Sequence, residues 1–225
     1  RAVGRVPGVY NSKDVQPLID AIKNIQSLKP LSKNPYYSNY FALSALSWSI
    51  SSRKTLHNIM GNSSNLYQSP FKGPNWTSTE LNNRIHFINC HGRSKVDKWY
   101  GDGLNIKPPS VEASNIRGKI SKGTVVASEC CFGAELYNPG GICNELLKDA
   151  IAFCGSTNIS YGNSIQQSCA DIMVQYFLQN ILLSQSSGIA LLDASVKFMS
   201  STTRITPAMY KTLAQFYLLG DPSVI

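Results

Sequence analysis

The side chains best suited to covalent chemistry in this sequence are a histidine and two adjacent cysteines. His91 follows an apolar run at 84–90, and Cys130 and Cys131 close a second run that begins at Thr124. A thiolate is a strong nucleophile, and a neighbouring imidazole favours the thiolate and serves as a general acid or base. These residues therefore predict nucleophilic catalysis, provided that the fold brings the two segments together.

Apolar runs of strand length alternate with helical patterns along the chain, which is typical of a mostly parallel sheet covered by helices on both faces. At the predicted helix 12–28, Asp14 is placed to cap the first turn, and Pro17 lies within that turn. No repeat or clear boundary divides the sequence, so residues 1–225 are expected to form one domain. The predicted strands are 2–6, 41–49, 84–90, 124–130 and 150–156, and the predicted helices are 12–28, 51–60, 166–183, 188–199 and 207–219.

The candidate reactive residues each follow a predicted strand. In an open parallel sheet, ligand sites lie just beyond the carboxyl ends of the strands. If the strands at 84–90 and 124–130 are neighbours, His91 and the cysteine pair reach one crevice. Gly92 lets the backbone turn sharply there, and its N–H, together with that of Cys131, is a candidate oxyanion-binding pair.

A zinc-binding module is the alternative use of these residue types. Cys90, His91, Cys130 and Cys131 are all potential zinc ligands. Structural zinc sites usually use pairs separated by two residues, whereas adjacent ligands strain the backbone, so we expect no metal at this position. The remaining cysteines lie in apolar patterns and are expected to be buried free thiols; they are Cys143, Cys154 and Cys169.

The charge pattern and the chain start constrain the partners. The formal net charge is +8, but the basic residues are spread thinly and no nucleic-acid-binding motif accompanies them, so no nucleic-acid partner is expected. No apolar segment reaches the roughly 18 residues of a membrane span. The first residue is Arg1 rather than Met, and no signal peptide is visible. We therefore expect a longer precursor, whose N-terminal portion is a candidate partner, and leave the compartment open.

Five segments carry a resemblance to a known family: VGRVPG (3–8), HFINCHG (86–92), SECCFGA (128–134), GSTNISYG (155–162) and LLGDPSVI (218–225). They resemble the gingipain-type family of cysteine peptidases, which has a caspase-like fold. The resemblance extends over almost the whole chain and implies a three-layer α/β/α domain with a mostly parallel central sheet. It also implies a secreted cysteine endopeptidase acting on proteins or peptides, with His91 as general acid/base. Several relatives use calcium, but no acidic loop here marks a calcium site and no cofactor is required.

The resemblance offers two frames for the nucleophile. Many members of the superfamily carry an acid or amide, a small residue, the cysteine and then a glycine two or three positions on. Glu129 to Gly133 fits that frame with Cys131 as nucleophile, whereas a Cys-x-x-Gly frame makes Cys130 the nucleophile. Cys131 is favoured because its frame also explains Glu129.

The family also implies where the P1 side chain of the substrate binds. Segments after the fifth strand line that pocket in relatives, which implies Ser156 and Tyr161 as substrate-binding residues and Asp171 as an acidic floor for Lys or Arg. The alternative for Asp171 is a helix-capping acid that complements the dipole. No third catalytic acid is found upstream of His91, so a Cys-His dyad is expected. A non-catalytic scaffold or binding domain is the alternative function.

Overall fold

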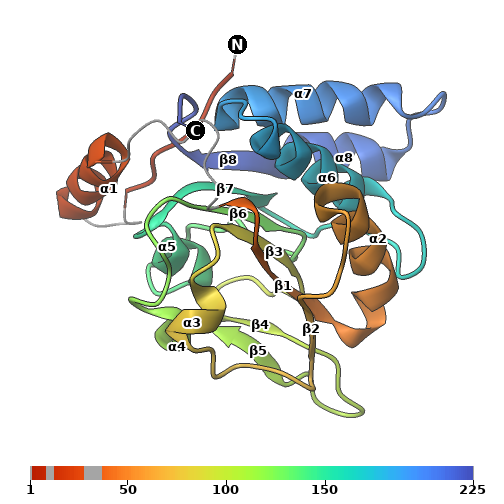
Figure 1. Cartoon of the computed structure of the whole chain (residues 1–225), viewed down its shortest axis with the longest axis horizontal. Helices are drawn as coiled ribbons and strands as arrows, with labels where there is room; N and C mark the ends of the chain where they lie inside the picture. The colour runs from red at the N-terminus through yellow and green to blue at the C-terminus, as the bar shows by residue number, and fades with distance from the viewer. Residues whose placement is uncertain (1, 9–12, 28–36, 225) are drawn as a thin grey trace.

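A central sheet organises the computed structural model, which describes residues 2–8, 13–27 and 37–224. Among these residues six strands form the sheet in the order β2–β1–β3–β6–β7–β8 (Figure 1). All neighbours pair in parallel except β8, which is antiparallel to β7. The strands are β1 (Tyr40–Ala45), β2 (Leu66–Ser69), β3 (Ile85–Asn89), β6 (Thr124–Ser128), β7 (Ala150–Ser156) and β8 (Phe216–Gly220), and a separate hairpin is formed by β4 (Lys98–Tyr100) and β5 (Pro109–Glu112).

The helices connect and cover the strands. Within the described part of the chain, no helix is long and apolar enough to cross a membrane. The helices are α1 (Gln16–Ser27), α2 (Ser49–Met60), α3 (Ser78–Leu81), α4 (Ala113–Ile116), α5 (Ile142–Leu146), α6 (Cys169–Leu182), α7 (Ser187–Ser200) and α8 (Pro207–Gln215), with a short 3₁₀ turn, η2 (Leu46–Trp48), before α2.

Alternating strand residues build a separate apolar core on each face of the sheet. Phe87 of β3 and Val125 of β6 belong to the core that α2, α6 and α7 cover. Ile88 and Val126, one position further along each strand, belong to the core formed with α4, α5 and the β4–β5 hairpin. The structure therefore confirms the predicted α/β/α architecture with a mostly parallel sheet.

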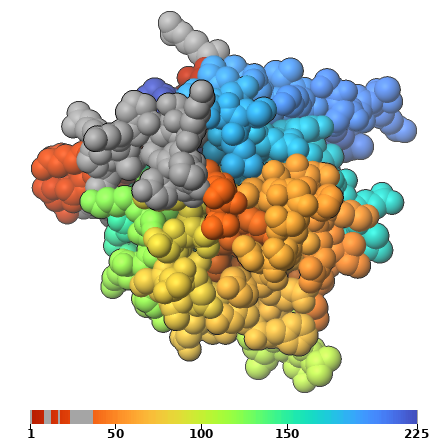
Figure 2. All heavy atoms as spheres, viewed as in Figure 1, coloured from red at the N-terminus to blue at the C-terminus, as the bar shows by residue number. Residues whose placement is uncertain are grey.

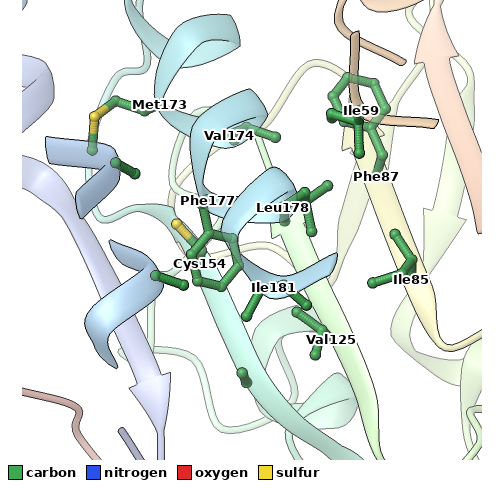
Figure 3. Close-up of a cluster of buried hydrophobic side chains, with 14 of the residues drawn as sticks. Ile59, Ile85, Phe87, Val125, Cys154, Met173, Val174, Phe177, Leu178 and Ile181 are labelled. Atoms are coloured by element: carbon green, nitrogen blue, oxygen red, sulfur yellow. The ribbon is translucent and has the colours of Figure 1, made fainter. Parts of the chain in front are cut away.

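Helix α6 is the main cover of the first face. Figure 3 shows its buried side chains directed toward Phe87, Val125 and Cys154 of the sheet. The side chain of Phe177 is fully buried, whereas Leu183, the residue that follows the end of this helix, is 70% exposed. The residues of α6 labelled in this core are Met173, Val174, Phe177, Leu178 and Ile181.

Most predicted elements are present with small shifts at their ends. The strand at 150–156 coincides with β7. Helix α1 occupies the predicted segment from Gln16 on, and Asp14 Oδ1 accepts a hydrogen bond from the Gln16 N–H at 2.9 Å, as expected of a cap. Residues 12 and 28, at the ends of the predicted helix, lie outside the described residues.

Three predicted elements are wrong in part. The predicted strand 41–49 ends at Ala45, and its last four residues belong to η2 and to the start of α2. The segment 2–6 is not a strand, because Arg5 forms only an isolated parallel bridge with Leu219. The predicted helix 207–219 ends at Gln215, and its last apolar residues begin β8. Phe216 lies in one core and Leu219 in the other, so burial on both faces of the sheet overrides the helical pattern.

Truncation of Phe177 tests the assignment of the main core. We expect Phe177→Ala to lower the free energy of unfolding by about 3–5 kcal/mol, because it leaves a cavity between α6 and the sheet. Leu183→Ala is the control and should change it by less than about 1 kcal/mol, since its side chain is mostly in water already. Equal losses in the two variants, measured by chemical denaturation, would contradict the assignment.

Candidate active site

The pairing of two strands places the candidate reactive residues at one edge of the sheet. Strands β3 and β6 are parallel neighbours, with Ile88 opposite Ser128 at their carboxyl ends. The Glu129 N–H extends the pairing by donating to the Ile88 carbonyl oxygen at 2.8 Å. His91 and Cys131 follow directly, which confirms the prediction that the two strands are neighbours.

The two chain segments touch at Gly92. A Cβ atom added to this residue would overlap the carbonyl oxygen of Cys131, so only glycine permits the observed approach. Beyond the cysteine the chain turns sharply, because Phe132 has a left-handed φ of 55°. Its N–H donates to the Asn158 carbonyl oxygen at 2.8 Å, which ties this turn to the loop after β7.

The two adjacent cysteines have different environments. Cys130 is fully buried, and its sulfur accepts a hydrogen bond from the Cys90 N–H at 3.3 Å. Burial raises the pKa of the Cys130 thiol well above its ordinary value. Cys131 is partly exposed, and its sulfur accepts a hydrogen bond from the Ser160 N–H at 3.4 Å. Of this pair, only Cys131 is accessible to a substrate.

An aspartate that the sequence reasoning missed holds the imidazole of His91. His91 Nε2 lies 2.7 Å from Asp102 Oδ1, and Asp102 Oδ2 accepts a hydrogen bond from the Ser47 N–H at 2.6 Å. Partial burial raises the pKa of Asp102, but the hydrogen bonds from Ser47 and His91 outweigh it, and the net pKa is below the ordinary value. An ionised Asp102 accepts a hydrogen bond from Nε2–H, so Nδ1 is the nitrogen left to exchange a proton with the nucleophile or substrate.

The position of Asp102 follows from the β4–β5 hairpin. His91 and Tyr100 form an antiparallel bridge with N–H to carbonyl distances of 2.9 and 2.8 Å. Asp102 lies two residues after Tyr100, at the start of the loop between β4 and β5. The expected absence of a third catalytic acid concerned the segment upstream of His91, whereas Asp102 lies downstream of it. The short strand-like pattern before Gly101 could have indicated a hairpin. It could not have shown that the hairpin pairs with His91.

Asp171 lies next to Glu129 beneath the loop that follows β7. It is fully buried at the start of α6, and its Oδ2 accepts a hydrogen bond from the Ser168 N–H at 3.1 Å in a capping box. Burial, followed by the charge of Asp171, raises the pKa of Glu129 well above its ordinary value. Burial likewise raises the pKa of Asp171. Two buried carboxyl groups side by side repel each other when both are ionised, which favours a proton on one of them.

The other two predicted substrate-binding residues anchor the same loop. The Ser156 hydroxyl donates to the Asn158 carbonyl oxygen at 2.9 Å, and the side chain of Ser156 is buried. The Tyr161 hydroxyl accepts a hydrogen bond from Lys211 Nζ at 3.1 Å, and the Tyr161 carbonyl accepts one from the Ala170 N–H. Ser156 and Tyr161 thus both hold the loop that connects β7 to α6.

The structure also bears on the alternative that these cysteines and His91 bind zinc. Burial raises the pKa of the Cys90 thiol to about 12, which disfavours the thiolate that zinc binds. Among the residues that the structure describes, no group of three or more His, Cys, Asp or Glu side chains is arranged to hold a metal ion.

A comparison with known protein families gives a match over nearly the whole chain. The family model for peptidase family C25 matches residues 2–225. The chain belongs to peptidase family C25. This membership confirms the resemblance to the gingipain-type peptidases that the sequence motifs indicated.

Comparison with solved structures supports the fold of this C25 family member. One matching structure, titled "Structure of Protease", has a TM-score of 0.58 and 14% sequence identity. The match covers 95% of this chain and 54% of that one, so the C25 chain spans about half the length of the solved chain. No curated protein sequence matches this C25 chain.

The buried carboxyl pair predicts a pH-dependent stability of this C25 chain. Because its folded pKa is raised, Glu129 keeps a proton in the folded state at pH values where the unfolded chain has lost it, and the free energy of unfolding falls as pH rises through that window. Glu129→Gln removes this loss. At pH 8 we expect the free energy of unfolding of the variant to exceed that of wild type by about 1.4 kcal/mol for each unit by which folding raises the pKa of Glu129. At pH 4 the two proteins should differ little. An equal change at both pH values, measured by denaturation, would contradict the raised pKa of Glu129.

Proposed function

We propose that this chain is a cysteine endopeptidase with Cys131 as nucleophile and His91 as general acid and base. The observation that carries the proposal is the convergence of three groups: an accessible thiol, an imidazole on the neighbouring strand end, and Asp102 bonded to that imidazole. An acid that orients a histidine beside a nucleophile is the arrangement that acyl-transfer enzymes use on several unrelated folds.

The proposed reaction uses only groups of this chain and water. The thiolate of Cys131 attacks the scissile carbonyl carbon and forms a tetrahedral intermediate. The C–N bond then breaks as His91 Nδ1 donates its proton to the leaving amine, and a thioester remains. A water molecule gives a proton to His91 and attacks the thioester, which releases the acid product and restores the thiolate.

Two backbone N–H groups are proposed to stabilise the negative oxygen of the tetrahedral intermediate. Among the described residues, neither the Gly92 N–H nor the Cys131 N–H donates a hydrogen bond within the protein. Unpaired N–H groups at a turn beside the nucleophile are the donors expected of an oxyanion hole. The close approach of Gly92 to the backbone of Cys131 supports this pairing.

Asp102 is proposed to position His91, which makes the site a triad rather than the predicted dyad. Its carboxylate fixes Nε2 as the protonated nitrogen and favours the imidazolium that forms when the thiol loses its proton. The hydrogen bond from Ser47 fixes the carboxylate in turn.

A preference for Lys or Arg at P1 is proposed from the buried carboxyl pair. Glu129 Oε1 and Asp171 Oδ1 are buried and have no hydrogen-bond partner among the described residues. The loop from Ser160 to Gly162 separates them from the accessible side of Cys131, since Ser160 contacts the thiol and Gly162 lies against Asp171. A basic side chain would reach the pair when this loop shifts, and its charge would compensate theirs.

A peptide library varied at P1 tests this function on wild type and three variants. We expect cleavage after Lys or Arg by wild type, and a loss of at least about 1,000-fold in kcat/KM in Cys131→Ala and in His91→Ala. Cys130→Ala is the matched control and should keep activity within about tenfold of wild type, because its thiol is buried.

Three results of this experiment would contradict the proposal. Activity that survives in Cys131→Ala but not in Cys130→Ala would reassign the nucleophile. Cleavage by wild type without a basic P1 preference would remove the role given to Glu129 and Asp171. An absence of cleavage at every P1 residue, with no thiol labelled by a mild alkylating agent, would favour the non-catalytic scaffold.

A further inference from the structure

The β4–β5 loop, residues 101–108, carries an exposed apolar tip directly beside the candidate active site. Leu104 is fully exposed, and Ile106 is 81% exposed. Figure 2 shows the loop as green atoms that project beyond the surrounding surface at the lower right, and Figure 1 traces them to the turn between β4 and β5. Two large apolar side chains at one loop tip are costly to hydrate and mark a contact surface.

Both the base and the tip of the loop are held in place. The Gly101 N–H donates to the Pro108 carbonyl oxygen at 2.9 Å, which closes the base. A Cβ added at Gly103 would overlap the Ile106 carbonyl oxygen, so the tip is a tight turn. Asp102 is bonded to both Ser47 and His91. A tip fixed in this way binds a partner with little loss of conformational entropy.

The tip lies close to His91 on one side of the site. An extended chain advances by at most about 3.6 Å per residue, so the Cα of Leu104 lies within about 7 Å of the Cα of Asp102. The strand order β1–β3–β6–β7 places the Ser47 contact of this loop on the β1 side of His91. The loop proposed to border the P1 residue follows β7 and contacts Cys131 from the other side.

The chemistry of the proposed reaction determines which half of a substrate passes the tip. The general acid donates its proton to the leaving amine, so the chain that follows the scissile bond must pass next to His91. The residues on this leaving side are the primed residues. An extended peptide rises about 3.3 Å per residue, so the tip corresponds to roughly the second or third primed residue.

We infer that Leu104 and Ile106 form a primed-side subsite that selects substrates with Leu, Ile or Val at P2′ or P3′. This inference rests on the proposed peptidase function and adds a specificity determinant to it. The same loop then carries out two tasks: Asp102 positions the imidazole, and the apolar tip binds the leaving half of the substrate.

Internally quenched peptides that share one non-primed half test the subsite. The series carries Leu or Asp at P2′ and at P3′, and the measured quantity is the ratio of kcat/KM for Leu to that for Asp. We expect a ratio of about ten or more for wild type and a ratio near one for the double variant Leu104→Ser/Ile106→Ser. Leu192→Ser/Val196→Ser, on the exposed face of α7, is the matched control and should keep the wild-type ratio.

The outcomes separate this inference from the proposed function. No cleavage of any peptide by wild type would overturn the peptidase function and the subsite with it. Cleavage without a primed-side preference, or an unchanged ratio in Leu104→Ser/Ile106→Ser, would overturn the subsite alone. Sedimentation that shows a dimer in wild type and a monomer in this double variant would assign the tip to contact with a second copy instead.

Discussion

The parallel pairing of β3 with β6 is the constraint on which the candidate active site depends. It brings the carboxyl ends of two strands together and places His91 and Cys131 at the same edge of the sheet. Gly92 makes the approach possible, because any side chain there would overlap the Cys131 carbonyl oxygen. The cores on both faces of the sheet fix the register, since a shift by one residue would move each side chain into the opposite core, which is packed around different side chains.

The groups that surround this pair come from the strands on either side. Ser47, after β1, holds Asp102, and Asp102 holds His91. The loop after β7 contacts Cys131 and covers the carboxyl pair of Glu129 and Asp171. The site is therefore assembled across four adjacent strands. Each contributes a loop at its carboxyl end, so the sheet supplies rigidity while the loops supply the chemistry.

The sequence predicted the parts of this arrangement that depend on local patterns. The alternating apolar runs located β3, β6 and β7, and the residues after them identified His91 and Cys131 as candidates. Asp102 was missed because its role depends on the bridge between His91 and Tyr100, a contact without a periodic signature. The residues from Phe216 on form β8 although their pattern predicts helix, because an apolar run buried on both faces has no period of two.

The central claim is that Asp102 and His91 together activate Cys131. The most direct test is the rate at which iodoacetamide alkylates each cysteine at pH 6 and pH 9, followed by peptide mass mapping of wild type and Asp102→Asn. The account predicts rapid labelling of Cys131 in wild type at pH 6, and labelling at least about tenfold slower in Asp102→Asn at pH 6 but not at pH 9, because the carboxylate favours the imidazolium–thiolate pair. Equal rates at pH 6, or labelling of Cys130 before Cys131, would contradict it.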